Sequence, residues 1–376
     1  MRVLLISHTC QNHEGQPKAW QLAQMPGVEL TVLSPDRWFV YGEWKRAVPP
    51  QNAPFRFVVG KVMWPWSGKG QWYLHWYPGL ARLMRSFQPD VIDLWEEPWG
   101  LVSAHACWLR EHLAPHAKIV SETEQNILKA LPPPFETFRR YTLQRADFCV
   151  ARNTEATEVL RAKGFAGETR VVPNAVDAEL FRPMHREECR AKWGSSGFVV
   201  GYVGRLVEEK GLMDALEALP HCATEVNLLL VGTGDFQAAL EKRAQELGLS
   251  SRVRFVGAKP SSELPSVMNA MDVLILPSRT TPRWKEQFGR VLIEAHACQV
   301  PVIGSDSGAI PDVVGQGGLV VPEGDATAIA QAIETLRMNP SMGRAMGEAG
   351  RRQVEAHYTW RRVAEKMYGI YQDVLS

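Results

Sequence analysis

Short apolar runs alternate with segments of helical apolar spacing along this chain, and the alternation occurs in two series. In the first series the runs are residues 2–7, 28–33, 90–95, 119–121 and 148–151. In the second series they are residues 198–203, 226–231, 253–256, 272–277 and 302–304. Runs of this length, separated by helices, are typical of strands buried on both faces of a parallel sheet. The pattern predicts an α/β protein of two Rossmann-like domains that face each other across a cleft.

The residues between the two series, Pro183 to Gly197, are mostly polar. They predict a linker or a short helix that leads into the second domain. The last periodic segment, Trp360 to Leu375, predicts a helix, which we expect to return to the first domain. We therefore assign residues 1–182 and 359–376 to the first domain and residues 183–358 to the second.

One stretch of the second series, Glu286 to Asp312, places two glutamates around the start of a predicted helix. Apolar spacing indicates a helix from Phe288 until Pro301, with a strand on either side. The eight residues from Glu286 to Glu294, if helical, span roughly 12 Å. That is about the reach of a sugar, a diphosphate and a ribose laid end to end, and a helix N-terminus suits phosphate. The spacing therefore predicts a nucleotide-sugar site.

Composition narrows the class of protein. The formal net charge is +1 over 376 residues, which excludes a bulk nucleic-acid binder, and 22% charged residues is typical of a globular protein. The six cysteines form no CxxC pair and no zinc-ligand spacing, so we expect reduced thiols in a cytoplasmic protein. No apolar run reaches eighteen residues, and no membrane-spanning helix is expected.

Residues 37–89, which we call the basic aromatic segment, are unusual. They contain one acid, Glu43, against eight arginines and lysines, and six tryptophans. This mixture suits peripheral contact with an anionic membrane, at the inner face of the membrane for a cytoplasmic protein. It equally suits stacking against a sugar acceptor, and a third interpretation places many of the rings in the core. The pattern does not choose among these.

Two polar positions of the first domain follow predicted strands. Gly15 lies in the turn after the first strand, where a nucleotide-binding loop would lie, but no GxGxxG is present, and the glycine alone is better explained as a turn residue than as a ligand contact. Glu124 follows the strand at residues 119–121. Ligands of open α/β sheets bind beyond the carboxyl ends of the strands, which makes both positions candidates.

Four segments, in this order, resemble a retaining glycosyltransferase of family 4 with the GT-B fold, also called glycosyltransferase group 1. They are VVPNAVDAELFRP (171–183), YVGRLVEEKGL (202–212), LLLVGTGD (228–235) and EQFGRVLIEAHACQVPVIGSDSGAIPDVV (286–314). The last is the most specific, because glutamates at this spacing seldom coincide with FG and PV. The resemblance is strong in the second half and only architectural before it.

The resemblance implies roles for residues at the matching positions. Arg205 and Lys210 would hold the donor diphosphate and stabilise the charge of the leaving group, although either alone could be a surface charge. Glu286 would contact the donor sugar, and Glu294 the ribose. The other donor-binding positions implied are Gly204, Gly232, Gly234, Gln287, Phe288, Gly289 and Arg290, with Val253 and Arg254 beside the base.

This chain departs from the family pattern at several positions. The substitutions within the motifs are Ala175, Gln299 and Ala309 for glycine and Asp312 for glutamate. None replaces the key glutamates or cations, so an active enzyme is expected. Many relatives have a histidine where Glu124 aligns. Glu124 would then orient the acceptor hydroxyl or take its proton, with a structural role as the alternative.

The predicted function is transfer of a hexose, with retention, from a nucleotide diphosphate sugar to a hydroxyl of a glycan or lipid-linked glycan. No cofactor is expected, and without a DxD motif we expect no metal. Two alternatives are a nucleotide-sugar epimerase or hydrolase of the same fold and a non-catalytic subunit of a glycosylation complex. The sequence leaves the base, the sugar and the acceptor open.

Overall fold

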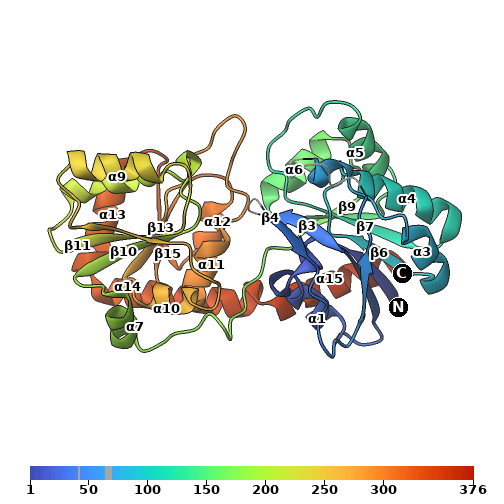
Figure 1. Ribbon diagram of the computed structural model, residues 1–376, viewed down its shortest axis with the longest axis horizontal. Coiled ribbons are helices and arrows are strands. Elements are labelled where there is room, and N and C mark those ends of the chain that lie inside the picture. Colours follow the sequence, from blue (N-terminus) through green and yellow to red (C-terminus); the bar gives the residue numbers. More distant parts are fainter. Residues whose placement is uncertain (41–42, 64–69) are drawn as a thin grey trace. The chain divides into compact units, whose positions relative to one another are not determined.

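The computed structural model describes residues 1–40, 43–63 and 70–376, so Trp64, Trp66 and Lys69 of the basic aromatic segment lie outside it. The chain forms two compact units (Figure 1). Unit 1 comprises Met1–Pro173 and Trp360–Ser376, and unit 2 comprises Asn174–Thr359. Within the described residues no helix has the length and apolarity needed to cross a membrane.

Unit 1 is built on a seven-stranded parallel sheet of order β5-β2-β1-β6-β7-β8-β9. Its strands are β1 (Arg2–Ile6), β2 (Glu29–Pro35), β5 (Arg56–Gly60), β6 (Val91–Leu94), β7 (Lys118–Thr123), β8 (Phe148–Ala151) and β9 (Glu168–Val171). The central strands β1 and β6 are buried on both faces, which is why they read as unbroken apolar runs.

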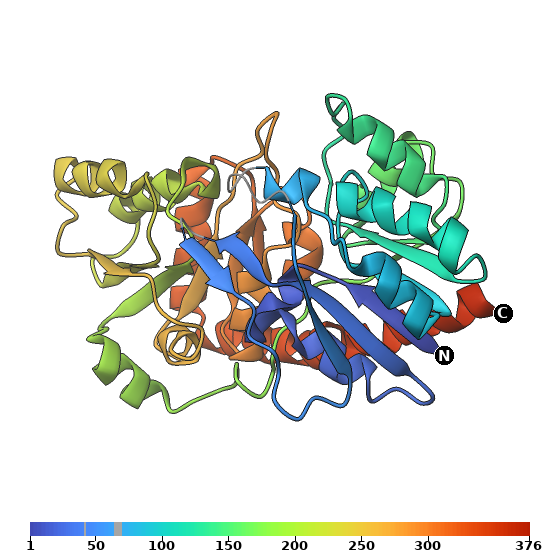
Figure 2. The same ribbon diagram turned by 45° about the vertical axis from the view of Figure 1, so that its right-hand side comes forward.

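Helices cover the sheet of unit 1 on both sides. They are α1 (Pro17–Leu22), α2 (Gln71–Leu74), α3 (Leu80–Phe87), α4 (Leu101–Leu113), α5 (Phe135–Leu143), α6 (Thr154–Ala162) and α15 (Trp360–Leu375). Helices α3, α4 and α5 pack in a row, whereas α1 packs against α15 (Figure 2). The last helix of the chain therefore belongs to unit 1. Val363, Met367 and Ile370 supply its buried stripe.

The basic aromatic segment contains elements that the apolar pattern did not predict. They are an antiparallel hairpin, β3 (Arg37–Val40) with β4 (Glu43–Arg46), the edge strand β5, and the helices α2 and α3. Its tryptophan rings differ in burial: Trp38 is 2% exposed, whereas Trp72 is 49% exposed. Edge strands and hairpins bury one face at most, so they carry no continuous apolar run.

Unit 2 is built on a six-stranded parallel sheet of order β12-β11-β10-β13-β14-β15. Its strands are β10 (Phe198–Val203), β11 (Val226–Val231), β12 (Val253–Gly257), β13 (Val273–Leu276), β14 (Val302–Ser305) and β15 (Gly318–Val321). Its helices are α7 (Arg186–Trp193), α8 (Leu212–Ala218), α9 (Gln237–Glu246), α10 (Leu264–Asn269), α11 (Arg290–Ala297), α12 (Ile310–Val314), α13 (Ala326–Met338) and α14 (Pro340–Gln353). Helices α9 and α13 lie on one side of the sheet and α10 and α14 on the other (Figure 1).

The boundary between the units lies after Pro173, whereas we expected it after residue 182. Residues on both sides of the expected boundary belong to unit 2. The amide of Val176 donates to the carbonyl of Tyr358 at 2.8 Å, and Phe181 is 5% exposed in the core of unit 2. Composition could not reveal this, because a segment that crosses between domains looks like any polar loop until its backbone partners are known.

Candidate functional site

Three glycines bring the carboxyl ends of β10 and β11 together. A Cβ on Gly232, whose φ is 141°, would overlap the carbonyl oxygen of Gly204. A Cβ on Gly234 would overlap the carbonyl oxygen of Leu206, whose amide donates to the carbonyl of Thr233 at 3.0 Å. Backbone meets backbone at these positions, which only glycine permits. The result is a glycine-lined edge at the carboxyl ends of two central strands, the side of a parallel sheet where ligands bind.

The loop after β10 carries Lys210 at the end of a single 3-10 turn, η3 (Glu208–Lys210). Gly211 follows with φ 65°, and a Cβ there would overlap the carbonyl oxygen of Pro277 at the end of β13. This close approach holds the loop against the neighbouring strand. The side chain of Lys210 reaches the loop after β13, where its Nζ lies 2.6 Å from Oε2 of Glu286 and 4.9 Å from the ring centre of Trp284.

Glu286 is held in a defined place by three segments. It is 8% exposed, and the hydroxyl of Ser278 donates to its Oε2 at 2.9 Å beside the Lys210 ammonium. Its backbone carbonyl accepts from the amide of Ala309, and a Cβ on Gly308 would overlap that carbonyl. A carboxylate this buried needs such partners. The sequence-predicted glutamate and lysine are therefore brought into direct contact.

Helix α11 begins two residues later than the apolar spacing suggested. Gly289 precedes it with φ 81°, and the helix runs from Arg290. Glu286 therefore lies outside the helix, and the 12 Å estimate for its distance from Glu294 does not apply. Phe288 is 4% exposed and packs edge-on against Tyr358 at 5.7 Å, so its ring belongs to the core and is not available to a ligand.

The remaining predicted donor residues differ in environment. Glu294 is half-buried on α11, Gln287 is half-buried before it, and Arg290 is exposed at the first position of the helix. Arg205 is exposed directly after Gly204, and among the described residues no ion pair of its guanidinium is found. Arg205 and the N-terminus of α11 are thus open to an anion from solvent.

Val253 and Arg254 are corrected by the structure. Both lie at the amino-terminal end of β12, the opposite end of the strand from the glycine-lined edge. The guanidinium of Arg254 donates to the backbone carbonyls of Trp193 and Gly194, which fixes it beside the end of α7. Because the strands of the sheet are parallel, only their carboxyl ends can contribute to the edge of the site. We therefore remove both residues from it.

In unit 1, Gly15 is explained by its turn. It closes a 3-10 turn, η2 (His13–Gly15), and its amide lies 3.2 Å from the side-chain oxygen of Asn12. A Cβ on Gly15 would overlap the carbonyl oxygen of Thr9. The close contact that requires glycine at position 15 is thus with the backbone of Thr9 in the same chain.

Glu124 contacts neighbouring side chains at the end of β7. Its carboxylate lies 3.4 Å from Nε of Arg152, and its amide donates to the carboxylate of Glu97 at 2.9 Å. Glu97 also accepts from the hydroxyl of Thr123 at 2.6 Å. Burial raises the pKa of Glu97 to about 8, because these hydrogen bonds offset only part of the lost hydration. Sequence reasoning selected Glu124 and missed Glu97, which is the more perturbed carboxyl.

A buried ionic network ties unit 1 together. Lys18 of α1 is 1% exposed and contacts Asp93 of β6 at 3.2 Å and Glu122 of β7. Arg152 pairs with Glu122, and the hydroxyl of Tyr371 on α15 donates to Asp93 at 2.6 Å. Burial raises the pKa of Asp93, and so does the nearby carboxylate of Glu122. Burial also opposes ionisation of Glu122, but the positive charges of Arg152 and Lys18 outweigh it, and the pKa of Glu122 is lowered. The network joins α15 to the sheet and is structural.

The structure also brings together His8 and Glu96, which sequence reasoning missed. His8 follows β1 and Glu96 follows β6, and these two strands are neighbours in the sheet. Nδ1 of His8 lies 2.7 Å from Oε2 of Glu96, and the His8 amide donates to Oε1 at 2.6 Å. The signal available in the sequence was that both residues follow buried strands, the criterion that was applied only to Glu124.

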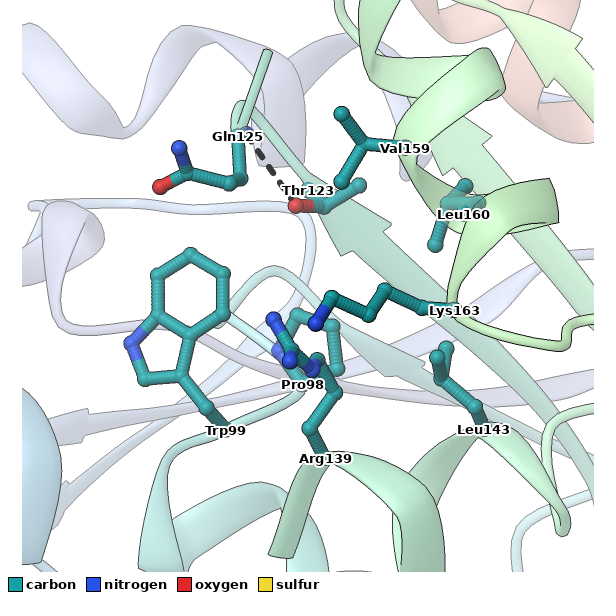
Figure 3. Close-up of a pocket in the computed structure, with 9 residues that line it drawn as sticks. All are labelled: Pro98, Trp99, Thr123, Gln125, Arg139, Leu143, Val159, Leu160 and Lys163. Atoms are coloured by element: carbon teal, nitrogen blue, oxygen red, sulfur yellow. Dashed lines mark hydrogen bonds between the residues drawn. The ribbon is translucent and has the colours of Figure 1, made fainter. Parts of the chain in front are cut away.

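A small pocket opens beside Trp99 at the carboxyl end of β7 (Figure 3). Its lining residues are Pro98, Trp99, Thr123, Gln125, Arg139, Leu143, Val159, Leu160 and Lys163. The two cations of this set point into it, but both are also paired with the carboxylate of Glu136. We assign this pocket no ligand.

Two family models match this chain. The model of glycosyl transferases group 1 matches residues 185–353, and that of glycosyltransferase family 4 matches residues 19–180. Together they cover both units, each by its own model.

Curated relatives agree with these matches. A capsular polysaccharide biosynthesis glycosyltransferase of Staphylococcus aureus is 30% identical over 314 residues, which are 79% of this chain and 80% of that protein. A GDP-mannose-dependent monoacylated alpha-(1-6)-phosphatidylinositol monomannoside mannosyltransferase of Corynebacterium glutamicum is 32% identical over 212 residues. That match covers 54% of this chain and 55% of the relative, so the chain matches about half the length of this relative.

Solved structures show the fold. Sucrose-phosphate synthase from Thermosynechococcus elongatus superimposes with a TM-score of 0.77 at 23% identity, covering 100% of this chain and 99% of that one. HepE of Anabaena, in complex with UDP, gives a TM-score of 0.73 at 19% identity, covering 99% and 100%. The predicted GT-B fold class is confirmed.

Proposed function

This chain belongs to the group 1 glycosyltransferases of family 4, and on that premise we propose that it transfers a hexosyl group from a nucleotide diphosphate sugar to a hydroxyl group. The observation that carries the proposal is the contact between Lys210 and Glu286. A cation suited to a diphosphate and a carboxylate suited to sugar hydroxyls meet beside a glycine-lined edge of one sheet. Neither residue alone distinguishes a donor site from a surface charge.

The roles follow from the chemistry of each group. The Lys210 ammonium and the exposed Arg205 guanidinium would bind the diphosphate, and the N-terminus of α11 would add backbone N–H donors. Glu286 would accept hydrogen bonds from donor sugar hydroxyls, and Glu294 from the ribose. Because the two side chains already touch, a sugar bound at Glu286 brings its attached phosphate to Lys210.

The proposed step breaks the bond between C1 of the sugar and the phosphate oxygen and forms a bond from C1 to the acceptor oxygen. The acceptor proton passes to the leaving phosphate, which is the base in a reaction with retention. The nucleoside diphosphate departs with its added negative charge, and fixed cations stabilise that charge as it grows. Lys210 and Arg205 supply this stabilisation in a metal-independent reaction without a cofactor.

The proposed acceptor is a glycan or a lipid-linked glycan. The two curated relatives act on a phosphatidylinositol mannoside or belong to capsular polysaccharide biosynthesis, which supports this class of acceptor. In the basic aromatic segment Arg37, Lys45, Arg46, Arg56 and Trp44 are exposed. We propose that this surface contacts anionic lipid at the cytoplasmic face of a membrane. Sedimentation with vesicles of anionic and of neutral lipid tests it, and equal sedimentation would exclude it.

Turnover of nucleotide sugars by the purified protein tests the proposed function. A panel of nucleotide sugars is first ranked by thermal shift, since a bound ligand raises stability by mass action. Glu286→Ala should then lower transfer by a factor of about 100 to 1,000 while donor binding is retained. Glu241→Ala on α9, a glutamate whose side chain accepts from Gln237, is the matched control. Unchanged turnover in Glu286→Ala would exclude a role for this carboxylate in holding the donor sugar.

Adding and omitting candidate acceptors separates the alternatives. A transferase consumes donor faster with its acceptor, and an epimerase or hydrolase consumes it equally without one. A non-catalytic subunit binds the donor but consumes none.

A further inference from the structure

His8 and Glu96 lie at the point where the order of the strands in the sheet of unit 1 reverses. From β1 the chain continues to β2 on one side, whereas β6, the other neighbour of β1, leads on to β7, β8 and β9. In open α/β sheets, ligands bind at such a point, beyond the carboxyl ends of the two central strands. His8 comes two residues after the end of β1, and Glu96 two residues after the end of β6.

Glu96 fixes the orientation of the His8 ring. One carboxylate oxygen accepts from the His8 amide at 2.6 Å, and the other lies 2.7 Å from Nδ1. Glu96 is 6% exposed, and Nε2 of His75 lies 3.8 Å from its Oε1. Burial alone would raise the pKa of Glu96, but the imidazoles of His8 and His75 lower it to about 2, so the group is a carboxylate at neutral pH. A carboxylate accepts a hydrogen bond from Nδ1–H, and in a neutral imidazole with that tautomer the lone pair is on Nε2.

The Nε2 atom of His8 is available to a ligand. The His8 side chain is 14% exposed, and among the described residues no hydrogen bond of Nε2 is found. On one face the ring stacks on the buried Trp38 with centroids 4.7 Å apart. The tryptophan and the glutamate together prevent the ring from turning, so Nε2 is an acceptor with a fixed direction.

Trp72 lies beside this acceptor. Its ring meets His8 edge-on with centroids 4.7 Å apart and meets Trp38 at 5.5 Å. Unlike Trp38, which is 2% exposed, Trp72 is 49% exposed. An aromatic ring that is packed along one edge and exposed to solvent elsewhere is suited to a ligand with both apolar and polar groups.

A saccharide has this chemistry. One face of a pyranose presents C–H groups that pack on an aromatic ring, and its rim presents hydroxyls that donate to an acceptor such as Nε2. The Glu96 carboxylate is 6% exposed and faces its imidazole and amide donors, so it presents little of its charge to a ligand. A nucleotide diphosphate would need cations, which the group formed by His8, His75, Trp38, Trp72 and Glu96 does not provide.

We propose that Trp72 and His8, oriented by Glu96, form a carbohydrate-binding subsite of unit 1 that holds a sugar ring of the acceptor. The assignment of that sugar to the acceptor rests on the proposed function, whereas the binding of a saccharide does not. Glu124, whose carboxylate lies 3.4 Å from Nε of Arg152 and whose side chain is 41% exposed, remains a separate candidate for an acceptor contact in unit 1.

Binding of methyl glycosides of glucose, mannose and galactose, followed by saturation-transfer NMR, tests the subsite in the full chain. Trp72→Ala removes the platform and should weaken binding of the best glycoside about fivefold, the equivalent of about 1 kcal/mol of stacking on an aromatic ring. Trp108→Ala is the matched control, because Trp108 on α4 is likewise 49% exposed. Its glycoside binding should equal that of the wild type.

His8→Asn isolates the role of Nε2. The asparagine amide can still donate to Glu96 from the place of Nδ1, but it has no atom at the place of Nε2. We expect it to fold with the thermal stability of the wild type to within a few degrees and to lose glycoside binding. Unchanged binding in Trp72→Ala and His8→Asn, equal loss in Trp108→Ala, or no glycoside binding by the wild type would each overturn the proposal.

Turnover of nucleotide sugars in the same preparations keeps the two proposals apart. If the wild type consumes donor but the variants bind glycosides as it does, the subsite is wrong and the function stands. If glycosides bind at Trp72 but no nucleotide sugar is consumed, the function is wrong and the subsite stands.

Discussion

The ammonium of Lys210 lies 2.6 Å from the carboxylate of Glu286, across two loops that leave neighbouring strands of one sheet. The residues expected to hold the diphosphate and the sugar of a donor thus hold each other. The pair is largely hidden from solvent, with side-chain exposures of 16% and 10%. A donor phosphate therefore competes with Glu286 for the lysine.

This competition predicts that substitution of Lys210 weakens nucleotide binding whereas substitution of Glu286 does not. Lys210→Gln should weaken binding of UDP or GDP by a factor of about 10 to 100, the value of a charge-assisted hydrogen bond. Glu286→Gln should leave that affinity unchanged or raise it, because it frees the lysine. Titration calorimetry measures both, with Arg243→Gln on α9 as a surface control. A parallel loss in Lys210→Gln and Glu286→Gln would contradict the competition.

The approach of Gly211 to Pro277 predicts a glycine that cannot be replaced. Gly211 and Gly248 have nearly the same backbone, with φ of 65° and 68°, but a Cβ on Gly248 meets nothing within 4 Å. Alanine should cost about 1 to 2 kcal/mol at either position for the left-handed conformation. Gly211→Ala should cost more and should also weaken nucleotide binding, since it pushes the Lys210 loop off β13. Equal unfolding free energies for the two variants, measured in urea, would refute this.

Replacing Gln299 by glycine should stabilise the folded protein. It follows α11 with φ 58°, at a position where the family pattern has glycine. Gln299→Gly should raise the free energy of unfolding by about 1 kcal/mol by relieving the left-handed strain. Gln88, with φ 48°, is the contrast, because its side-chain amide donates to three backbone carbonyls, and Gln88→Gly would remove these hydrogen bonds. Thermal unfolding should show a gain for the first variant and none for the second.

His296 predicts a loss of stability in acid. Burial lowers the pKa of His296 on α11 to about 4, below the 6.5 of the unfolded chain. Between these values the unfolded state binds the proton and the folded state does not, so stability falls as the pH drops from 6.5 to 4. The full loss is about 3 kcal/mol at most.

Urea unfolding of the wild type and of His296→Leu at pH 7 and pH 4.5 isolates this contribution. The variant should lose less stability between the two pH values than the wild type. Equal losses would show that another group causes the acid sensitivity.

The sequence by itself determined the features that are local. Strands of both parallel sheets were predicted because they are buried on two faces and read as apolar runs. The glycines and Lys210 of unit 2 were selected by the resemblance of their motifs to the family, and the structure shows a local reason for those glycines, because backbone meets backbone there. Arg254 was placed beside the base by comparison with the family, and the structure places it at the amino-terminal end of β12, away from the site.

Only the tertiary structure decided which distant side chains meet. His8 and Glu96 are separated by 88 residues and touch because β1 and β6 are neighbours, and Lys18 reaches Glu122 across 104 residues for the same kind of reason. Apolar runs specify that strands exist but not their order, since every buried strand presents the same pattern. The order of the strands sets the contacts at their carboxyl ends. For that reason the proposed donor residues could be selected along the chain, whereas the contact between His8 and Glu96 became visible only in the folded sheet.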